Sequence, residues 1–121
     1  MIALVVDDSR AMRMVLRRML TELGFTVHEA PDGPTAISAV SSGLAADLVM
    51  MDWHMPQMQG VDVVAALRAE PIRFSGKIVM VTTETEAAQM LTALDAGADE
   101  YLMKPFSADA VVEKLQLLDL I

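Results

Sequence analysis

Polar residues stand at the ends of successive short apolar segments in this 121-residue chain, and their types suit phosphorus and metal chemistry. They are Asp7 and Asp8, Asp52, Thr82 and Lys104. Parallel α/β sheets bind ligands outside the carboxyl ends of their strands, so residues far apart in the sequence meet in one crevice there. Three carboxylates, a hydroxyl and an amine in one crevice predict a cation site beside a phosphoryl site.

The three aspartates are expected to bind a divalent cation. Carboxylates that share a pocket repel one another, so the pKa of at least one of them should be raised. A divalent cation removes this conflict. An all-oxygen ligand set without a cluster of His and Cys favours Mg²⁺ or Mn²⁺ over zinc. We expect the cation to keep several waters, since two or three carboxylates do not complete an octahedron.

Asp52 has the chemistry of a nucleophile, because a carboxylate beside Mg²⁺ can attack phosphorus, as in aspartyl-phosphate ATPases. Phosphoryl transfer mainly requires positioning and neutralisation of charge. The cation would balance one phosphoryl oxygen and Lys104 a second, while the Thr82 hydroxyl could reach a third. Each residue alone has an ordinary structural interpretation, such as a helix N-terminus for the aspartate pair. Their joint occurrence at successive strand ends favours the functional interpretation.

The elements that must position these residues alternate strictly. Apolar strands at 2–6, 25–30, 48–51, 78–81 and 101–103 are each followed by a segment of helical character. This alternation predicts a parallel sheet with right-handed crossovers. Boundary signals agree with it, namely N-cap serines, a proline at a first helical position and glycines as helix stops: Ser9, Ser107, Pro34, Gly24, Gly43 and Gly97. Residues 54–59 read as a loop, after which Gly60 permits unusual backbone angles and begins a helix over 60–70. The next helix is expected over 86–96.

Composition excludes several classes of protein. The net charge of −8 argues against nucleic-acid binding, although not against a basic protein partner. A hydrophobic content of 54% argues against disorder, and the absence of cysteine leaves no thiolate metal site. No apolar run approaches the ~18 residues of a membrane helix. Met1 leads into an apolar strand without a basic region. We expect one domain over 1–121, in the cytoplasm, without membrane or nucleic-acid contacts.

Four motifs around these residues closely resemble the receiver domain of bacterial response regulators, in particular its single-domain, CheY-like kind. They read VVDDS at 5–9, MDWHMPQMQG at 51–60, VTTE at 81–84 and YLMKPF at 101–106. The resemblance covers essentially the whole chain. It implies a doubly wound, flavodoxin-like (βα)5 fold with strand order 2-1-3-4-5.

The resemblance also implies roles for the residues of the acidic pocket. Asp52 accepts a phosphoryl group from the phosphohistidine of a histidine kinase or a histidine phosphotransfer protein. Asp8 and Asp52 ligate Mg²⁺, with the backbone carbonyl of His54 as a third protein ligand, and Asp7 acts through metal-bound water. Lys104 pairs with Asp52 and with the phosphoryl oxygens, and its bond to Pro105 is cis.

Two further residues form the switch that the resemblance implies. Thr82 moves to bond the phosphoryl group, and Tyr101 swings inward to fill the vacated space. This movement links the site to the surface of the last strand and the last two helices, where partner proteins bind.

Some residues have roles that the motifs leave open. His54 and Glu84 stand two residues after Asp52 and Thr82, beside the path of an attacking water, and are expected to tune the lifetime of the phosphorylated state. Trp53 should report metal binding by fluorescence. Four arginines in the first helix form either a solvated face or a docking surface for the kinase: Arg10, Arg13, Arg17 and Arg18.

The leading functional hypothesis is a phosphorylation-controlled interaction module that catalyses only its own phosphoryl transfer and dephosphorylation, and so is not an enzyme for a separate substrate. A metal-dependent aspartyl-phosphate hydrolase is one alternative, but those enzymes place a second aspartate where His54 stands. A degenerate receiver that binds constitutively is another, against which the five intact functional positions speak. The sequence leaves the protein target open. It also leaves open whether the chain is a stand-alone monomer, in chemotaxis or a phosphorelay, or an excised domain of a longer regulator.

Overall fold

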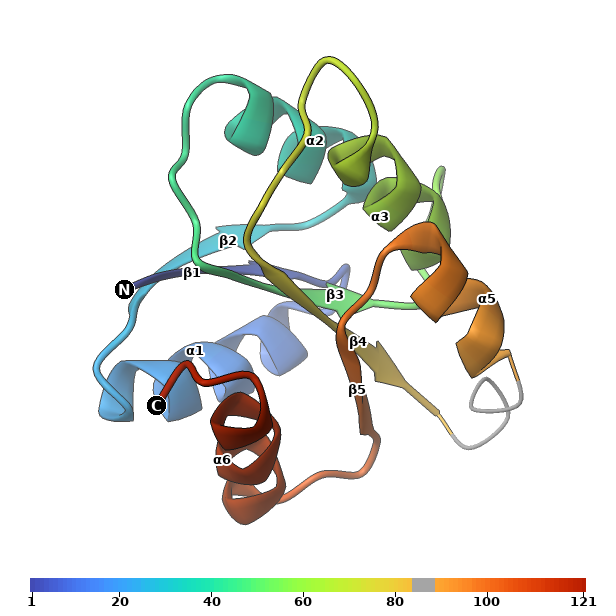
Figure 1. Cartoon of the computed structure of the whole chain (residues 1–121). Helices are drawn as coiled ribbons and strands as arrows, with labels where there is room; N and C mark the ends of the chain where they lie inside the picture. The colour runs from blue at the N-terminus through green and yellow to red at the C-terminus, as the bar shows by residue number, and fades with distance from the viewer. Residues whose placement is uncertain (84–88) are drawn as a thin grey trace.

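The computed structural model describes residues 1–83 and 89–121. A five-stranded parallel sheet in the order β2-β1-β3-β4-β5 lies between two layers of helices (Figure 1). The strands are β1 (Ile2–Val6), β2 (Thr26–Ala30), β3 (Leu48–Asp52), β4 (Lys77–Thr82) and β5 (Glu100–Met103). The helices are α1 (Arg10–Glu22), α2 (Gly33–Ser41), α3 (Gly60–Arg68), α5 (Met90–Ala96) and α6 (Ala108–Leu117). The doubly wound α/β fold and its strand order are confirmed.

Both faces of the sheet are buried, which explains why its strands are continuous apolar runs. Successive side chains of a strand point to opposite faces. In β1, Ala3 and Val5 pack with α1 and α6, whereas Leu4 and Val6 pack with α2, α3 and α5. Burying one such Leu or Val side chain stabilises the fold by about 1.5–3 kcal/mol, so the two cores together hold the sheet rigid.

The helices begin largely where the sequence predicts. Ser9 Oγ accepts a hydrogen bond from the Met12 amide at 3.2 Å, and Ser107 Oγ accepts one from the Ala110 amide at 3.1 Å. Helix α3 ends at Arg68, two residues earlier than expected, since the chain turns extended ahead of Pro71. Other strand and helix boundaries differ from expectation by one or two residues.

One expected helix is only partly covered by the described residues. Its start near Glu86 lies outside them, and its described portion is α5, which ends at Gly97 with φ +121°. No described helix has the length and apolar character needed to cross a membrane.

The carboxyl ends of the strands lie along one edge of the sheet, toward the lower right in Figure 1. β3 pairs with β1 and with β4, so Asp52 lies directly beside Val81 and one strand away from Asp7, which follows β1. Thr82, the last residue of β4, pairs with Met103 at the end of β5, and Lys104 follows it. The topology alone therefore places the predicted residues along one crevice.

Candidate functional site

Three carboxylates meet at the carboxyl ends of β1 and β3. One oxygen from each of Asp7, Asp8 and Asp52 lies within 4.8 Å of the others. Asp7 and Asp52 are buried, whereas Asp8 is exposed. The Ser9 amide donates to Asp7 Oδ1 at 2.8 Å. Asp7 Oδ2 is buried and has no hydrogen-bond partner among the described residues, which leaves an acceptor free for a ligand.

The two buried aspartates have raised pKa values. Burial is the largest cause for Asp52 and raises its pKa from 3.8 to about 6, although the hydrogen bond from Lys104 acts in the opposite direction. Burial also raises the pKa of Asp7. Repulsion between the carboxylates contributes to both shifts as a smaller cause. The predicted rise is therefore confirmed, but desolvation outweighs the repulsion from which we predicted it.

Lys104 supplies positive charge at the floor of this pocket. Its Nζ donates to Asp52 Oδ1 at 3.0 Å and lies 3.8 Å from Asp7 Oδ2. The Lys104 amide donates to the Thr82 carbonyl at 2.6 Å, which holds the end of β5 against the end of β4. The Lys104–Pro105 peptide bond is cis, as the resemblance implies.

Thr82 is a second buried residue whose polar atom is left unused. Its side chain is 1% exposed, and Oγ1 has no hydrogen-bond partner in the described part of the chain. The hydroxyl of a threonine at a strand end usually bonds to backbone, and no such bond is present here among the described residues. The hydroxyl is therefore available to a ligand oxygen in the crevice.

The loop after Asp52 is closed by a tight approach of α3. The Gly60 amide donates to the Trp53 carbonyl at 2.8 Å, and a Cβ at Gly60 would collide with the carbonyl oxygen of Asp52. Gly60 is thus required by close packing rather than by the unusual backbone angles that we expected. The left-handed conformation in this loop falls on Gln57, with φ 73°. The contact fixes the backbone that carries the phosphoacceptor candidate.

The predicted tuning residues are only partly placed. His54 is exposed at the rim of the crevice, and its Nδ1 lies 3.1 Å from Gln59 Oε1. No observed contact tests its backbone carbonyl as a metal ligand, so that role stays a prediction. Glu84 lies outside the described residues.

The acidic cluster suits a hard divalent cation. Mg²⁺ binds oxygen ligands at roughly 2.0–2.1 Å, which brings coordinating oxygens to within about 4.2 Å of one another. The aspartate oxygens are close to this spacing already, so small side-chain rotations suffice. Asp7 Oδ2 also lacks a hydrogen-bond donor that a cation would have to displace among the described residues. The residues present therefore fit Mg²⁺ or Mn²⁺, as predicted from the ligand types.

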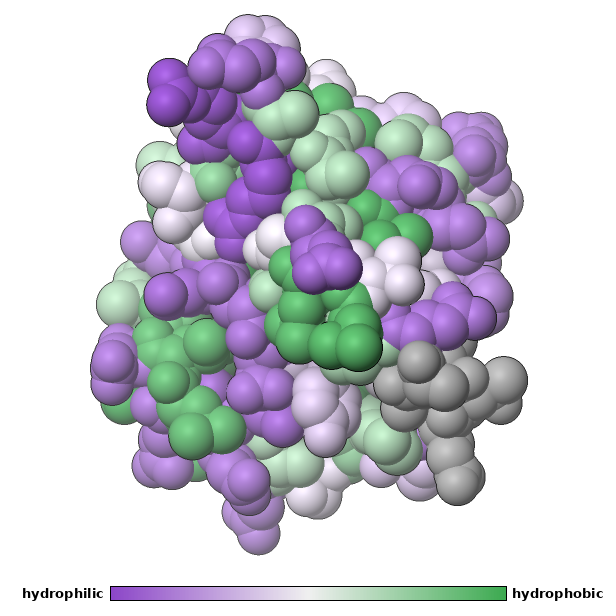
Figure 2. Space-filling model, turned by 45° about the vertical axis from the view of Figure 1, so that its right-hand side comes forward, coloured by the Kyte–Doolittle hydropathy of each residue, from purple (hydrophilic) through white to green (hydrophobic). Residues whose placement is uncertain are grey.

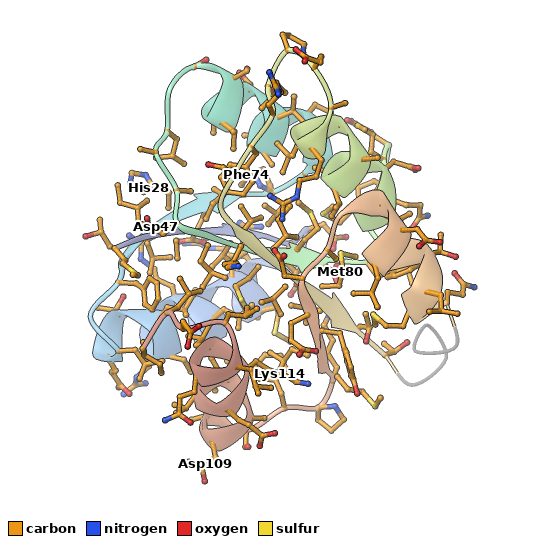
Figure 3. All side chains as sticks on the ribbon, in the orientation of Figure 1. His28, Asp47, Phe74, Met80, Asp109 and Lys114 are labelled. Atoms are coloured by element: carbon orange, nitrogen blue, oxygen red, sulfur yellow. The ribbon has the colours of Figure 1, made fainter. Side chains whose placement is uncertain are left out.

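Tyr101 lies on β5, where it is paired with Met80 of β4. It is half-buried, and Lys114 Nζ lies 4.1 Å from the centre of its ring. Lys114 reaches from α6 toward β5 (Figure 3) and also pairs with Glu100 Oε1 at 3.3 Å. Hydrophobic patches lie between hydrophilic side chains on the face shown in Figure 2. Large apolar residues are exposed on α5, β5 and α6: Leu91, Leu94, Met103 and Leu117.

Arg13 is a residue whose contacts the sequence analysis missed. Its side chain is only 15% exposed, and Nη1 donates to the Asp7 carbonyl at 2.7 Å. Neither a solvated face nor a docking surface describes it, whereas Arg18, with 86% of its side chain exposed, fits a solvated face. The position of Arg13 in the sequence could have predicted this contact, because a side chain one helical turn after the cap residue Ser9 lies over the loop that precedes the helix.

Comparison with known proteins agrees with this geometry. Residues 3–116 match the response regulator receiver domain family. The chain is 40% identical over 114 residues to chemotaxis protein CheY of Pseudomonas aeruginosa, covering 93% of this chain and 91% of that protein. It is 38% identical to chemotaxis protein CheY1 of Helicobacter pylori, covering 95% and 94%. The solved structure of chemotaxis response regulator CheY4 of Vibrio cholerae superposes with a TM-score of 0.87 at 31% identity, covering 97% of both chains.

Proposed function

Because the chain belongs to the response regulator receiver domain family, we propose that Asp52 is the residue through which this two-component regulator is switched by phosphorylation. The observation that carries the proposal is the setting of Asp52. Its carboxylate ends the central strand, is held at 3.0 Å from Lys104 Nζ, and lies in a cluster with two further aspartates. The donor is the phosphohistidine of a histidine kinase or of a histidine phosphotransfer protein.

The reaction is a direct transfer to the carboxylate. An Asp52 oxygen forms a bond to phosphorus while the bond between phosphorus and the donor imidazole breaks. The imidazole leaves with the electron pair of that bond and takes up a proton from solvent. Asp52 must be ionised to attack, and with a pKa of about 6 it is mostly ionised at neutral pH.

The other residues of the crevice neutralise and orient the transferred group. Asp8, Asp52 and the His54 carbonyl would hold Mg²⁺ directly and Asp7 would hold it through water, and the ion would supply positive charge to a phosphoryl oxygen. Lys104 leaves its bond with Asp52 Oδ1 and pairs with a second oxygen. The Thr82 hydroxyl donates to a third, which satisfies a buried group that otherwise lacks a partner among the described residues.

The output is a change of surface rather than a released product. When Thr82 turns toward the phosphoryl group, Tyr101 moves inward from its position beside Lys114 and alters the surface formed by α5, β5 and α6. The exposed apolar residues of this surface suit a protein partner. Phosphorylation would bias an equilibrium between two arrangements that already exist.

The biological setting is part of the same proposal and is supported by the relatives. We assign the chain to the cytoplasm, as a monomer that acts on a protein target and turns over no separate substrate. A role in chemotaxis is supported by the relatives named CheY. The basic first helix would dock the phosphodonor through Arg10, which is exposed at the start of α1.

The test is intact mass after incubation with acetyl phosphate, with and without Mg²⁺, on the wild type and on Asp52→Asn. We expect one phosphoryl adduct that requires Mg²⁺ and is absent from the variant. Asp62→Asn, which removes a carboxylate from the following helix, is the matched control and should be modified like the wild type. An adduct that persists in Asp52→Asn would place the acceptor elsewhere.

A further inference from the structure

The backbone carbonyl of Asp7 is the starting point, because it lies where β1 has run out of strand partners. The pairing of β1 with β3 ends at Val6, and the Asp7 amide makes a last bond to the Ala30 carbonyl at 3.1 Å. The Asp7 carbonyl has instead a side-chain donor, Nη1 of Arg13, at 2.7 Å. One guanidinium group thus supplies the hydrogen bond that a neighbouring strand would otherwise donate to the Asp7 carbonyl.

That bond controls the plane of the peptide between Asp7 and Asp8. Asp8 is exposed and has no core packing to hold its carboxylate. The loop is otherwise held by the Ser9 amide on Asp7 Oδ1 and by the Arg13 amide on the Ser9 carbonyl, at 2.8 Å and 3.0 Å. If the Asp7 carbonyl lost its donor, the peptide plane could rotate and carry the Asp8 carboxylate away from Asp52.

Glu29 on β2 keeps the guanidinium group in this position. Arg13 Nε donates to Glu29 Oε1 at 3.1 Å, and Arg17 binds the other carboxylate oxygen. The bonds from Arg17 and Arg13 also lower the pKa of Glu29, so it stays ionised at neutral pH. Without Glu29, the guanidinium could turn to the acidic cluster, whose carboxylates are strong acceptors for Arg. It would then compete with the cation.

We propose that Arg13, oriented by Glu29, is the positioning residue of the divalent-cation site: it fixes the Asp7–Asp8 peptide so that three carboxylates face one point. This inference rests on the proposed metal site and adds to it a pair outside the ligand set. Arg13 touches neither substrate nor cation. A residue that acts through ligand orientation should change metal affinity and leave the transfer step intact once the site is filled.

The experiment is isothermal titration with Mg²⁺ alone, with Trp53 fluorescence as a second readout, on the wild type, Arg13→Gln, Arg13→Lys and Glu29→Gln. Loss of a residue that orients a metal ligand typically weakens affinity 10–100-fold. We expect Arg13→Gln to raise the Mg²⁺ Kd about tenfold. The Mg²⁺ Kd of Arg13→Lys should lie between those of the wild type and Arg13→Gln, because an ammonium group lacks the planar fork that reaches two acceptors.

Controls separate positioning from general damage. Arg18→Gln removes an exposed arginine of the same helix, paired with Glu22 at 3.8 Å, and should leave the Kd unchanged. Urea unfolding tests that each variant is folded. At saturating Mg²⁺ the rate of phosphorylation by acetyl phosphate should return to the wild-type value in Arg13→Gln, because Asp52, Thr82 and Lys104 are intact.

The outcomes distinguish this inference from the proposed function. If the wild type binds Mg²⁺ and a folded Arg13→Gln binds it equally well, the positioning role is wrong and the metal site stands. If Arg13→Gln fails to fold, Glu29→Gln decides: a raised Kd supports the inference and an unchanged Kd overturns it. A wild type that binds no Mg²⁺ overturns both.

Discussion

The two ends of the central sheet both carry aspartates next to strand termini, and they use them in opposite ways. At the amino end, Asp47 Oδ2 accepts from the Ile2 amide and Asp99 Oδ2 accepts from the Ile78 amide, each at 2.8 Å. Each carboxylate thus ties the start of one strand to the residue just before a neighbouring strand, and Asp47 is labelled in Figure 3. At the carboxyl end, Asp7 and Asp52 are buried with raised pKa values.

Arg68 completes the contrast at the amino end. Its guanidinium group donates to the carbonyls of Phe74, Gly76 and Gly97 and to the Asp99 carboxylate, at 2.7–3.0 Å. It also lies over the Phe74 ring, 5.5 Å from its centre. One side chain thereby joins α3 to the segments that lead into β4 and β5. Here the charged groups satisfy one another and the backbone.

The carboxyl end instead has buried polar atoms that lack a hydrogen bond among the described residues, although Asp7 Oδ2 lies 3.8 Å from Lys104 Nζ. Asp7 Oδ2 and Thr82 Oγ1 are buried without hydrogen-bond partners among the described residues. A buried polar atom in this condition costs about 1–3 kcal/mol. This comparison predicts that the fold is stabilised at one end, while the other end carries unfavourable free energy that a cation and a phosphoryl group can relieve.

The largest change in stability is expected at the amino end. Arg68→Ala would remove the guanidinium donor of three carbonyls and one of the two donors of the Asp99 carboxylate, so the free energy of unfolding should fall by about 3 kcal/mol. Urea unfolding measures it. Arg73→Ala is the matched control, because Arg73 is 72% exposed and its ion pair within residues 1–83 and 89–121 is with exposed Glu70, and it should cost about 0.5 kcal/mol or less. Similar losses in both variants would remove the structural half of the comparison.

At the carboxyl end, by contrast, removing a charged group should raise the free energy of unfolding. The pKa of Asp52 is raised from 3.8 to about 6, so between these pH values the folded protein retains a proton that the unfolded chain has lost. The stability of the metal-free protein should therefore fall as pH rises through this window, and level off above it. Asp52→Asn cannot ionise, and above pH 7 it should be more stable than the wild type by about 2 kcal/mol.

Urea unfolding in the presence of a chelator, from pH 4 to pH 8, tests this expectation. The free energy of unfolding of Asp52→Asn should depend less on pH than that of the wild type. The dependence that remains should come from Asp7, whose pKa is also raised. Asp109→Asn removes an exposed carboxylate of α6 and should follow the wild-type curve. A wild type whose stability rises through the same window would contradict the stored free energy at Asp52.

The smallest of the three effects concerns Thr82. Thr82→Val replaces a buried hydroxyl without a described partner by a methyl group, so the metal-free protein should gain about 1 kcal/mol. Phosphorylation by acetyl phosphate should become slower, because the donor to the phosphoryl group is gone. Thr82→Ser keeps the hydroxyl, and should lose about 1 kcal/mol of stability while retaining transfer. A destabilised Thr82→Val would mean that the hydroxyl is satisfied in the folded protein.

Much of the carboxyl end could be predicted from the sequence, because strand ends have a clear pattern. An apolar run followed by Asp7, Asp52 or Thr82 marks the residue and the strand together, and parallel pairing does the rest. The order of the strands came from the resemblance. Residue roles such as that of His54 stay predictions, and Glu84 lies outside the described residues.

Contacts between elements could not be predicted in the same way, at either end of the sheet. Arg68 and Arg13 look like ordinary surface arginines of amphipathic helices, since their acceptors are mainly backbone carbonyls, which every residue has. The need for Gly60 arises from the approach of α3 to Asp52, a contact between elements that no local pattern encodes. Burial of Asp52, the main cause of its raised pKa, likewise depends on the packed fold.

The central claim, that ligand binding relieves free energy stored at the carboxyl end, is tested most directly by unfolding with and without Mg²⁺. At a Mg²⁺ concentration 100 times its Kd, the wild type should gain about 2.7 kcal/mol. Asp8→Ala should lose most of this gain, whereas Arg68→Ala should keep it from a lower starting stability. A wild type that gains nothing, or an Asp8→Ala variant that gains as much as the wild type, would contradict the account.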